Sequence, residues 1–412
     1  MSKPYFCAVI GKGFGDEGKG MAVDFLSSRH GKTLVIRHNG GAQSGHTVEL
    51  PDKRFVFHEL SSGSFRHADT MWAGTYFPDL YKLGEEADAF KALTGFVPVI
   101  YGEASVCVTI IDDVLVNMAA ESARGEGRHG SCGMGIYEAQ CRTEAGYGLT
   151  LKDLQEMSPE CLMKRLSDIR EQYLPNRLTE LMLQEKDLGE YGELLKSRTV
   201  LENVAREMLQ NLKYIRIVDS MEERLDDYDC VIFENGQGLL LDAENEVYAP
   251  HVTASRTGLT NPCKMLKNMN RQLDEVAYVT RSYVTRHGAG PLPNECAKSV
   301  LGKVEEDRTN QTNDWQGSLR YAKHEMPELF VQTIRQDLQQ IKEYELQMPM
   351  RTLLITHLNE TYHKLVCRDR VYALEDFCQV PAVADTFDRV LTSETHFSED
   401  IRSFDYSSAG KS

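Results

Sequence analysis

Residues 5–20 read YFCAVIGKGFGDEGKG, a short apolar run that passes directly into a glycine-rich loop. The run Tyr5–Ile10 predicts a buried strand, and a helix-length segment, Gly20–His30, separates it from a second β-branched run, Thr33–Ile36. A strand, a loop, a helix and a strand in this order are typical of the start of a parallel sheet. We therefore predict an α/β fold with a mostly parallel central sheet and helices on both faces.

The loop itself has the spacing of a phosphate-binding P-loop. Four residues separate Gly13 from Gly18 and Lys19, although Gly20 stands where a serine or threonine would ligate magnesium. Glycines let backbone N–H groups converge on an anion, the helix that follows adds its partial positive charge, and Lys19 can neutralise phosphate oxygens. The carboxylate of Asp16 would repel an anion, so we interpret it as a metal ligand or a base, with a loop-capping role as the alternative.

The rest of the chain predicts further strands around one helical block. Four more short apolar runs are candidate strands: Ser105–Ile111, Cys230–Phe233, Val276–Val284 and Thr352–Leu358. Residues 151–223 are rich in Leu, Glu, Lys and Arg at three-to-four spacing, which predicts a helical insertion with breaks near Pro159, Pro175 and Gly189–Gly192. We expect residues 1–412 to form a single domain that contains this insertion.

Charge and composition exclude several classes of function. With 46 Lys and Arg residues against 62 Asp and Glu, the net charge is −16, so we expect no binding to nucleic acid or to an anionic membrane surface. No apolar run approaches the roughly 18 residues of a membrane span, and no signal peptide is recognisable. The ten cysteines form no CxxC pair, and the runs around Cys7, Cys107 and Cys230 are typical of reduced core thiols. These features favour a reducing cytoplasm.

Three more glycine-rich segments carry polar side chains. GGAQSGHT at residues 40–47 contains Gln43, Gly45 and His46, GSCGMG spans residues 130–135, and ENGQG at residues 234–238 follows a candidate strand. An α/β sheet builds its site at the carboxyl ends of its strands, so we expect these loops to converge. A histidine beside phosphates can protonate or hydrogen-bond a leaving oxygen because its pKa lies near neutrality; the alternative for His46 is a structural loop histidine.

Taken in order, GDEGKG, GGxxxGHT, ENGQGxLLD followed by Thr253, and TRHGAGP at residues 285–291 resemble the motifs of the adenylosuccinate synthetase family. The resemblance implies a homodimeric, magnesium-dependent ligase with the P-loop-like fold of that family. It also implies a reaction in two steps: GTP phosphorylates the 6-oxygen of inosinate (IMP), and the amino group of aspartate then displaces the phosphate to give adenylosuccinate. Ionising N1 of the purine makes the 6-oxygen nucleophilic toward the γ-phosphoryl group.

The same resemblance implies roles for individual residues. Asp16 corresponds to the base at purine N1 and to a Mg²⁺ ligand, the Gly45 carbonyl to a second Mg²⁺ contact, and His46 to the acid at the transferring phosphoryl group. Nucleotide and phosphate positions correspond to Gly13, Phe14, Gly15, Glu17, Gly18, Lys19, Gly20 and Thr47. Purine-nucleotide positions correspond to Gln43 in place of an asparagine, Ser131 and Cys132 in place of two threonines, Gln237 and Thr253. Arg142 corresponds to an arginine that reaches the substrate phosphate across the dimer interface; a surface ion pair is the alternative.

Two segments depart from the family pattern, one on the amine side and one at the family's closing loop near the guanine. Where the family holds aspartate with consecutive arginines ahead of a tryptophan, this chain has Arg308, Thr309 and Asn310 ahead of Trp315. Because a dicarboxylate needs bidentate cationic partners, the change points to a different amine donor or to a loop replaced from elsewhere. The segment Leu391–Glu394 also has neither the glycine nor the proline of the family's closing loop.

A third departure concerns the phosphoryl donor. The family reads guanine with an aspartate after a late strand, and here the segment His357–Asn359 ends in an asparagine. An amide both donates and accepts hydrogen bonds, which suits adenine N1 and its 6-amino group, so we expect ATP rather than GTP.

Three hypotheses follow for the function. In the first, the activation chemistry acts on IMP and aspartate; in the second, the same chemistry uses ATP and a different amino acid or acceptor in a specialised pathway. The third is a catalytically silent nucleotide-binding partner, which the combination of Asp16, Lys19 and His46 disfavours. Neutral drift in a divergent synthetase would explain the departures without a change of substrate.

Overall fold

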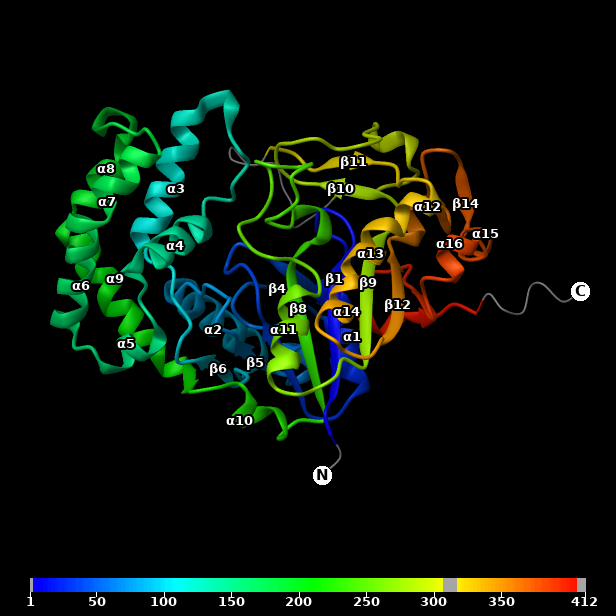
Figure 1. Ribbon diagram of the computed structural model, residues 1–412, viewed down its shortest axis with the longest axis horizontal. Helices are drawn as coiled ribbons and strands as arrows, with labels where there is room; N and C mark the ends of the chain where they lie inside the picture. The colour runs from blue at the N-terminus through cyan, green and yellow to red at the C-terminus, as the bar shows by residue number, and fades with distance from the viewer. Residues whose placement is uncertain (1–2, 307–316, 406–412) are drawn as a thin grey trace, which may run out of the picture.

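The computed structural model describes residues 3–306 and 317–405 (Figure 1). Its centre is a ten-stranded sheet in which every neighbouring pair is parallel except β15–β16. In spatial order the strands are β16 (Arg402–Ser403), β15 (Arg389–Thr392), β12 (Met350–Thr356), β9 (Glu275–Arg281), β1 (Tyr5–Gly11), β8 (Cys230–Gly238), β2 (Thr33–Arg37), β5 (Asp69–Trp72), β6 (Ile100–Glu103) and β7 (Ile215–Val218).

The central strand β1 is buried on both faces, as its unbroken apolar sequence predicts. Phe6, Ala8 and Ile10 point into one hydrophobic core, whereas Cys7 and Val9 point into another on the opposite side of the sheet. Helix α1 covers the second core, and α11, α13 and α14 contribute to the first. The predicted α/β fold with helices on both faces is therefore confirmed.

The helices divide between the sheet and a block beside it (Figure 1). Those that pack on the sheet or its C-terminal half are α1 (Lys19–Arg29), α2 (Leu80–Thr94), α10 (Glu222–Leu225), α11 (Thr260–Asn268), α12 (Pro327–Phe330), α13 (Gln332–Asp337), α14 (Gln339–Glu343), α15 (Leu374–Cys378) and α16 (Pro381–Ala384). The helical block comprises α3 (Ile111–Arg124), α4 (Ile136–Arg142), α5 (Leu151–Glu156), α6 (Pro159–Gln172), α7 (Leu174–Glu180), α8 (Gly189–Lys196) and α9 (Arg198–Asn211).

The helical block lies between β6 and β7 in sequence and packs through a core that it shares with α2 and with strands β3 (His46–Leu50), β4 (Lys53–Phe57), β5 and β6. Leu162, Leu166 and Ile169 of α6 meet Leu201 and Met208 of α9 at helical spacing, so each helix buries one apolar stripe. The breaks predicted near Pro159 and Pro175 coincide with the starts of α6 and α7, because proline is tolerated in the first turn of a helix.

Three local predictions were wrong. The run Ser105–Ile111 forms an isolated bridge at Cys107 and the start of α3 instead of a sheet strand. Residues 215–218, inside the stretch predicted as helical, form the sheet strand β7. The break predicted near Gly189–Gly192 does coincide with the start of α8 at Gly189. The run Val276–Val284 contains two strands, since the chain leaves β9 at Arg281 and re-enters at Val284 as β10 (Val284–Arg286).

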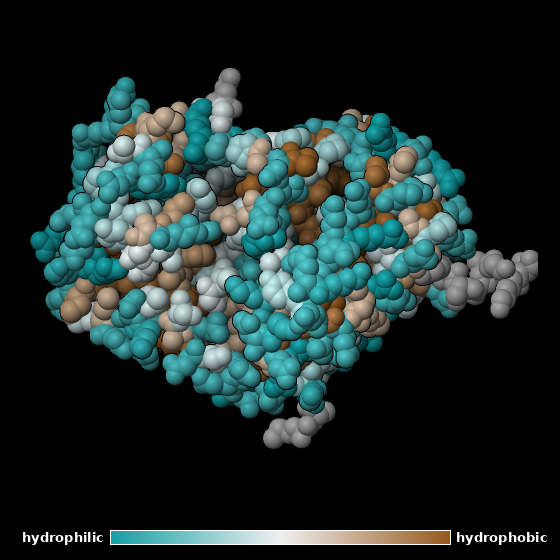
Figure 2. All heavy atoms as spheres, viewed as in Figure 1, coloured by the Kyte–Doolittle hydropathy of each residue, from teal (hydrophilic) through white to brown (hydrophobic). Residues whose placement is uncertain are grey.

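Small antiparallel pairs surround the carboxyl edge of the sheet. They are β3 (His46–Leu50) with β4 (Lys53–Phe57), β10 with β11 (Arg320–Ala322), and β13 (Lys364–Val366) with β14 (Val371–Ala373). Hydrophilic residues cover most of the face shown in Figure 2, with hydrophobic residues in a hollow in its upper half. Within the described residues, no helix is both long and apolar enough to span a bilayer.

Candidate active site

The glycine loop joins β1 to α1 at the carboxyl edge of the sheet. Three of its residues have positive φ angles: Gly15 at 97°, Asp16 at 56° and Gly18 at 93°. Gly18 is the N-cap of α1, which begins at Lys19, so the N-terminus of this helix lies at the end of the loop. Asp16 is not glycine, and a left-handed conformation in an L-residue is backbone strain that the surroundings must hold.

Beneath this loop lies a buried pair of opposite charges. Glu17 accepts a hydrogen bond from the Gly13 N–H at 2.6 Å, and burial raises its pKa to about 7 against the opposing effect of Lys19. Burial likewise lowers the pKa of Lys19, and the attraction of Glu17 counters that change. A Cβ on Gly11 would lie 2.4 Å from Glu17 Oε2, which explains the glycine at the end of β1. The Glu17 carboxylate therefore supports the loop from within.

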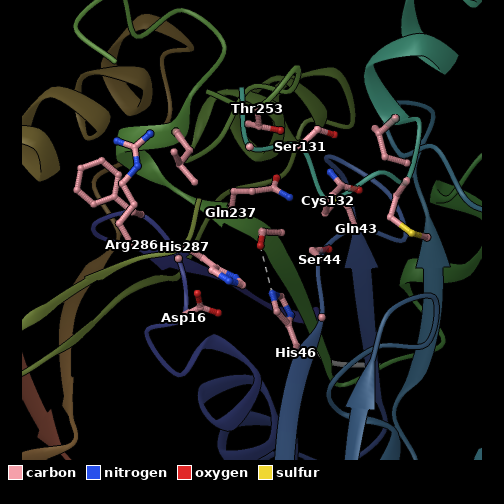
Figure 3. Close-up of a pocket in the computed structure, with 18 of the residues that line it drawn as sticks. Asp16, Gln43, Ser44, His46, Ser131, Cys132, Gln237, Thr253, Arg286 and His287 are labelled. Atoms are coloured by element: carbon pink, nitrogen blue, oxygen red, sulfur yellow. Dashed lines mark hydrogen bonds between the residues drawn. The ribbon is translucent and has the colours of Figure 1, made fainter. Parts of the chain in front are cut away.

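The imidazole of His46 sits on a buried carboxylate. His46 Nδ1 lies 2.6 Å from Glu234 Oε1, and since a carboxylate only accepts, Nδ1 carries the proton. Glu234 also accepts from Ser62 and lies 3.8 Å from Arg37 Nη1. Burial would raise the pKa of Glu234, but His46, Arg37 and Ser62 outweigh it and hold that pKa at about 2. Nε2 is left on the cavity side, 3.4 Å from the Gly236 carbonyl (Figure 3).

One cavity of about 1310 Å³ joins this wall to the other glycine-rich segments. Figure 3 shows Asp16 and His46 at one end and Ser131, Cys132, Gln237 and Thr253 facing them. The predicted residues that line the cavity are Phe14, Gly15, Asp16, Glu17, Gly18, Lys19, Gly20, Gln43, Gly45, His46, Thr47, Ser131, Cys132, Gln237, Thr253 and His357. Loops that start after β1, β2 and β8 thus converge, as parallel-strand topology requires.

On the wall opposite Asp16 and His46, polar groups are held in defined positions. Ser131 Oγ donates to Asn117 Oδ1 at 2.9 Å, and the Gly130 and Ser131 N–H groups donate to Glu121 Oε2 at 3.1 and 3.3 Å. Gln43 Oε1 is buried and meets no donor among the residues the structure describes. An unpaired buried acceptor that lines a cavity is a natural partner for a donor on a ligand.

Some predicted residues lie away from the cavity. Gly13 is buried against β8, where its carbonyl accepts from the Leu240 N–H at 3.0 Å. Asn359 is half-buried in the short helix Leu358–Thr361 and does not line the cavity, although His357 does. The predicted amine-donor residues Arg308, Thr309 and Asn310 lie outside the described residues.

The structure corrects the prediction for Arg142. Its guanidinium is fully buried inside the protomer and donates to both carboxylate oxygens of Asp113 at 2.9 Å and to the carbonyls of Val108 and Tyr147 at 2.8 Å. With its donors engaged in this way, Arg142 is positioned to hold α4 against α3 and not to reach a phosphate on a partner subunit.

Several residues in or beneath the cavity received no individual role from the sequence, although Arg286, His287 and Glu234 lie in the quoted motifs. Arg281 and Arg286 line the cavity from the ends of β9 and β10, and His287 follows Arg286 (Figure 3). Glu234 lies beneath it, within β8. The rule that sites gather at the carboxyl ends of parallel strands would have found Arg281, which ends β9, and Glu234, which directly follows the predicted strand Cys230–Phe233.

The cavity provides oxygen ligands for a divalent cation. The described residues contain no cluster of three or more His, Cys, Asp or Glu side chains suited to a metal. Asp16 and Gly45 line the same cavity, and Mg²⁺ is commonly bound through one or two carboxylates together with substrate phosphates, so the two metal contacts stay a prediction.

The fold and this cavity define an α/β protein of the nucleotide-handling class, with a phosphate loop at the carboxyl edge of a parallel sheet. The family model described as "Adenylosuccinate synthetase" matches residues 8–320. The chain therefore belongs to the adenylosuccinate synthetase family, and the resemblance inferred from its motifs is confirmed.

Individual relatives agree with this assignment. The chain is 30% identical over 290 residues to the adenylosuccinate synthetase of Synechocystis sp., covering 70% of this chain and 62% of that protein. It is 30% identical over 301 residues to that of Thermoplasma volcanium, covering 72% and 65%. The match thus spans slightly less than two thirds of these relatives.

Two solved structures share the fold along almost the whole chain. Adenylosuccinate synthetase from Plasmodium falciparum matches with a TM-score of 0.69 and 17% identity, covering 97% of this chain and 99% of that one. Succinoaminodeoxyadenylate synthetase (PurZ) of cyanophage S-2L, solved with dGMP and with dATP as an energy donor, matches with a TM-score of 0.61 and 12% identity, covering 98% and 96%.

Proposed function

We propose that this protein is a ligase that forms a C–N bond on a purine nucleotide after activating its 6-oxygen with a nucleoside triphosphate. The observation that carries the proposal is that Asp16, Lys19 and His46 line the same cavity as Gln43, Ser131, Cys132, Gln237 and Thr253. A phosphate loop alone would serve any nucleotide-binding protein. A carboxylate and a histidine at the same loop supply a base and an acid for an acceptor bound opposite.

In this proposal, Asp16 removes the proton from purine N1, and the negative charge moves to the 6-oxygen, which attacks the γ-phosphoryl group. Lys19 and the helix N-terminus hold the phosphates, and His46 Nε2 hydrogen-bonds the transferring phosphoryl group. Mg²⁺ held by Asp16 and the Gly45 carbonyl would neutralise phosphate charge. The amine then displaces phosphate from C6.

IMP and aspartate are the default substrates, and the family relationship supports them. The test is phosphate release with a panel of purine nucleotides and amino acids. Release with IMP and aspartate supports the default, whereas product with another amine and none with aspartate overturns it. Nucleotide binding without release for any pair would support the silent nucleotide-binding alternative.

For the phosphoryl donor we propose ATP. Asn359 in place of an aspartate favours it, although Asn359 stands two residues beyond the cavity-lining His357 and outside the cavity wall itself. The cyanophage protein with the same fold is described with dATP as an energy donor. Asn359→Asp should shift the kcat/KM ratio of GTP to ATP upward by at least about tenfold, because a carboxylate accepts from the two guanine donors. Asn270→Asp, in the exposed turn after α11, is the control. Robust turnover with GTP and none with ATP in the unmodified protein would refute this choice.

We also propose that the protein is a single-domain homodimer of the reducing cytoplasm. The ten cysteines, all free thiols, support the compartment, and the family relationship supports the dimer. The burial of Arg142 removes one expected contact across that interface, so a partner's contribution to the phosphate site would have to come from another residue.

A further inference from the structure

Arg281, the last residue of β9, contacts the strained part of the glycine loop. It is only 7% exposed, and its Nε donates to the Asp16 carbonyl at 2.5 Å. Strands β9 and β1 are neighbours, so the end of β9 lies beside the loop that leaves β1.

A second strand end holds the next peptide in the same way. Thr356, the last residue of β12, donates from Oγ1 to the Glu17 carbonyl at 3.0 Å. In a trans peptide the carbonyl and the following N–H point in opposite directions. Fixing the carbonyls of Asp16 and Glu17 therefore fixes the N–H groups of Glu17 and Gly18, which point away from these donors in a loop that lines the cavity.

Arg281 is itself held by a second contact. Its Nη1 lies 3.0 Å from the Tyr283 hydroxyl, which donates to the buried carboxylate of Glu360. Glu360 in turn accepts from the Glu305 N–H at 3.3 Å. Nε and Nη1 of Arg281 hydrogen-bond two partners in two fixed directions. A planar guanidinium can do this, whereas a single lysine ammonium cannot.

We propose that Arg281 is a positioning residue that holds the left-handed conformation of Asp16 and thereby aims both its carboxylate and the following N–H groups at the phosphoryl donor and acceptor. This role rests on the proposed function of the cavity. Arg281 acts through the loop, so its loss should slow activation more than it weakens binding, since misplacement of about 1 Å costs roughly 10²-fold in rate.

Activation can be isolated by positional isotope exchange in a triphosphate labelled at its β,γ-bridge, with the purine nucleotide present and the amine omitted. Arg281→Lys should lower the saturated exchange rate about 10²-fold, and Tyr283→Phe should lower it less, since it removes only the backing contact. Ethylguanidinium should restore part of the rate in Arg281→Ala. The control is Arg351→Lys at the far end of β12, whose guanidinium pairs with Asp388 at 2.7 Å.

A binding measurement separates this role from the proposed function. Calorimetry with inorganic tripolyphosphate should show roughly tenfold weaker binding in Arg281→Lys, because the loop N–H groups are less well aimed, and no change in Arg351→Lys. If the unmodified protein shows no exchange while Arg281→Lys still loses tripolyphosphate affinity, the proposed function fails and the positioning role stands. If Arg281→Lys exchanges the label at the rate of the unmodified protein under saturation, the positioning role is overturned, whatever its affinity for tripolyphosphate.

Discussion

Replacing Glu234 by glutamine tests the buried pair beneath His46. The substitution keeps the size of the side chain and removes its charge. Glu234 is inaccessible to solvent, and its carboxylate accepts from His46 at 2.6 Å and from Ser62, with Arg37 3.8 Å away. Glutamine leaves the Arg37 guanidinium and the His46 imidazole without their ionised partner.

The magnitude follows from the pKa of Glu234, which is about 2 in the folded protein against an ordinary value of 4.5. At about 1.4 kcal/mol per tenfold change, this lowering corresponds to roughly 3 kcal/mol of stability. Because the folded pKa is depressed, the contribution is complete above about pH 4.5 and is lost as the pH falls toward about 2. Glu234→Gln should therefore lower the free energy of unfolding by roughly 3 kcal/mol at neutral pH, with a deficit that shrinks in acid.

Urea unfolding of both proteins from about pH 7 to about pH 3 measures this difference. The control is Glu59→Gln, a buried glutamate whose pKa burial raises well above 4.5, so its substitution should not reproduce the loss at neutral pH. In the isotope-exchange assay, Glu234→Gln should also slow activation by up to about 10²-fold, because the imidazolium form of His46 loses its counter-charge. Equal midpoints at neutral pH, or a deficit that grows in acid, would refute the reasoning.

Two further predictions concern residues named from the sequence. Asp16→Asn should bind triphosphate with similar affinity yet lose turnover by several orders of magnitude, as measured by calorimetry and phosphate release; retained turnover would rule out the role of base. Arg142→Met should lower the free energy of unfolding by about 3–5 kcal/mol, because it leaves the buried carboxylate of Asp113 without its ion-pair partner. The turnover rate per folded molecule should be unchanged. If the variant is normally stable and only its KM for the purine nucleotide rises, Arg142 contacts the phosphate after all.

The central strands could be predicted because burial on both faces leaves a plain sequence signal. The run Tyr5–Ile10 became β1 within one residue, and Thr33–Ile36 became β2 within one residue. The four-residue strand β7 was missed since it follows a long helical block without a glycine or proline boundary, and only its pairing with β6 defines it. Local pattern cannot supply a partner that lies more than a hundred residues away.

The site shows the same division between local and tertiary information. Asp16, Lys19 and His46 could be chosen from the sequence because the residues of a phosphate loop are consecutive, and all three line the cavity. Arg142 was misplaced because its partner, Asp113, lies on another helix and 29 positions away, and an arginine beside a glycine-rich segment looks the same whether it faces substrate or core.

The residues that support the reactive groups explain how a short motif can hold its geometry. Asp16 adopts a left-handed conformation that would relax if unsupported, and Arg281 from β9 holds its carbonyl. Glu234 from β8 accepts a hydrogen bond from His46 Nδ1, which turns Nε2 toward the cavity and stabilises the imidazolium form that the proposed acid role requires. Both supports come from strands that flank β1, Arg281 from the end of β9 and Glu234 from within β8, so the parallel sheet sets the alignment of the proposed base and acid. It follows that a substitution at Arg281 or Glu234 should impair activation even when every residue of the glycine loops is intact.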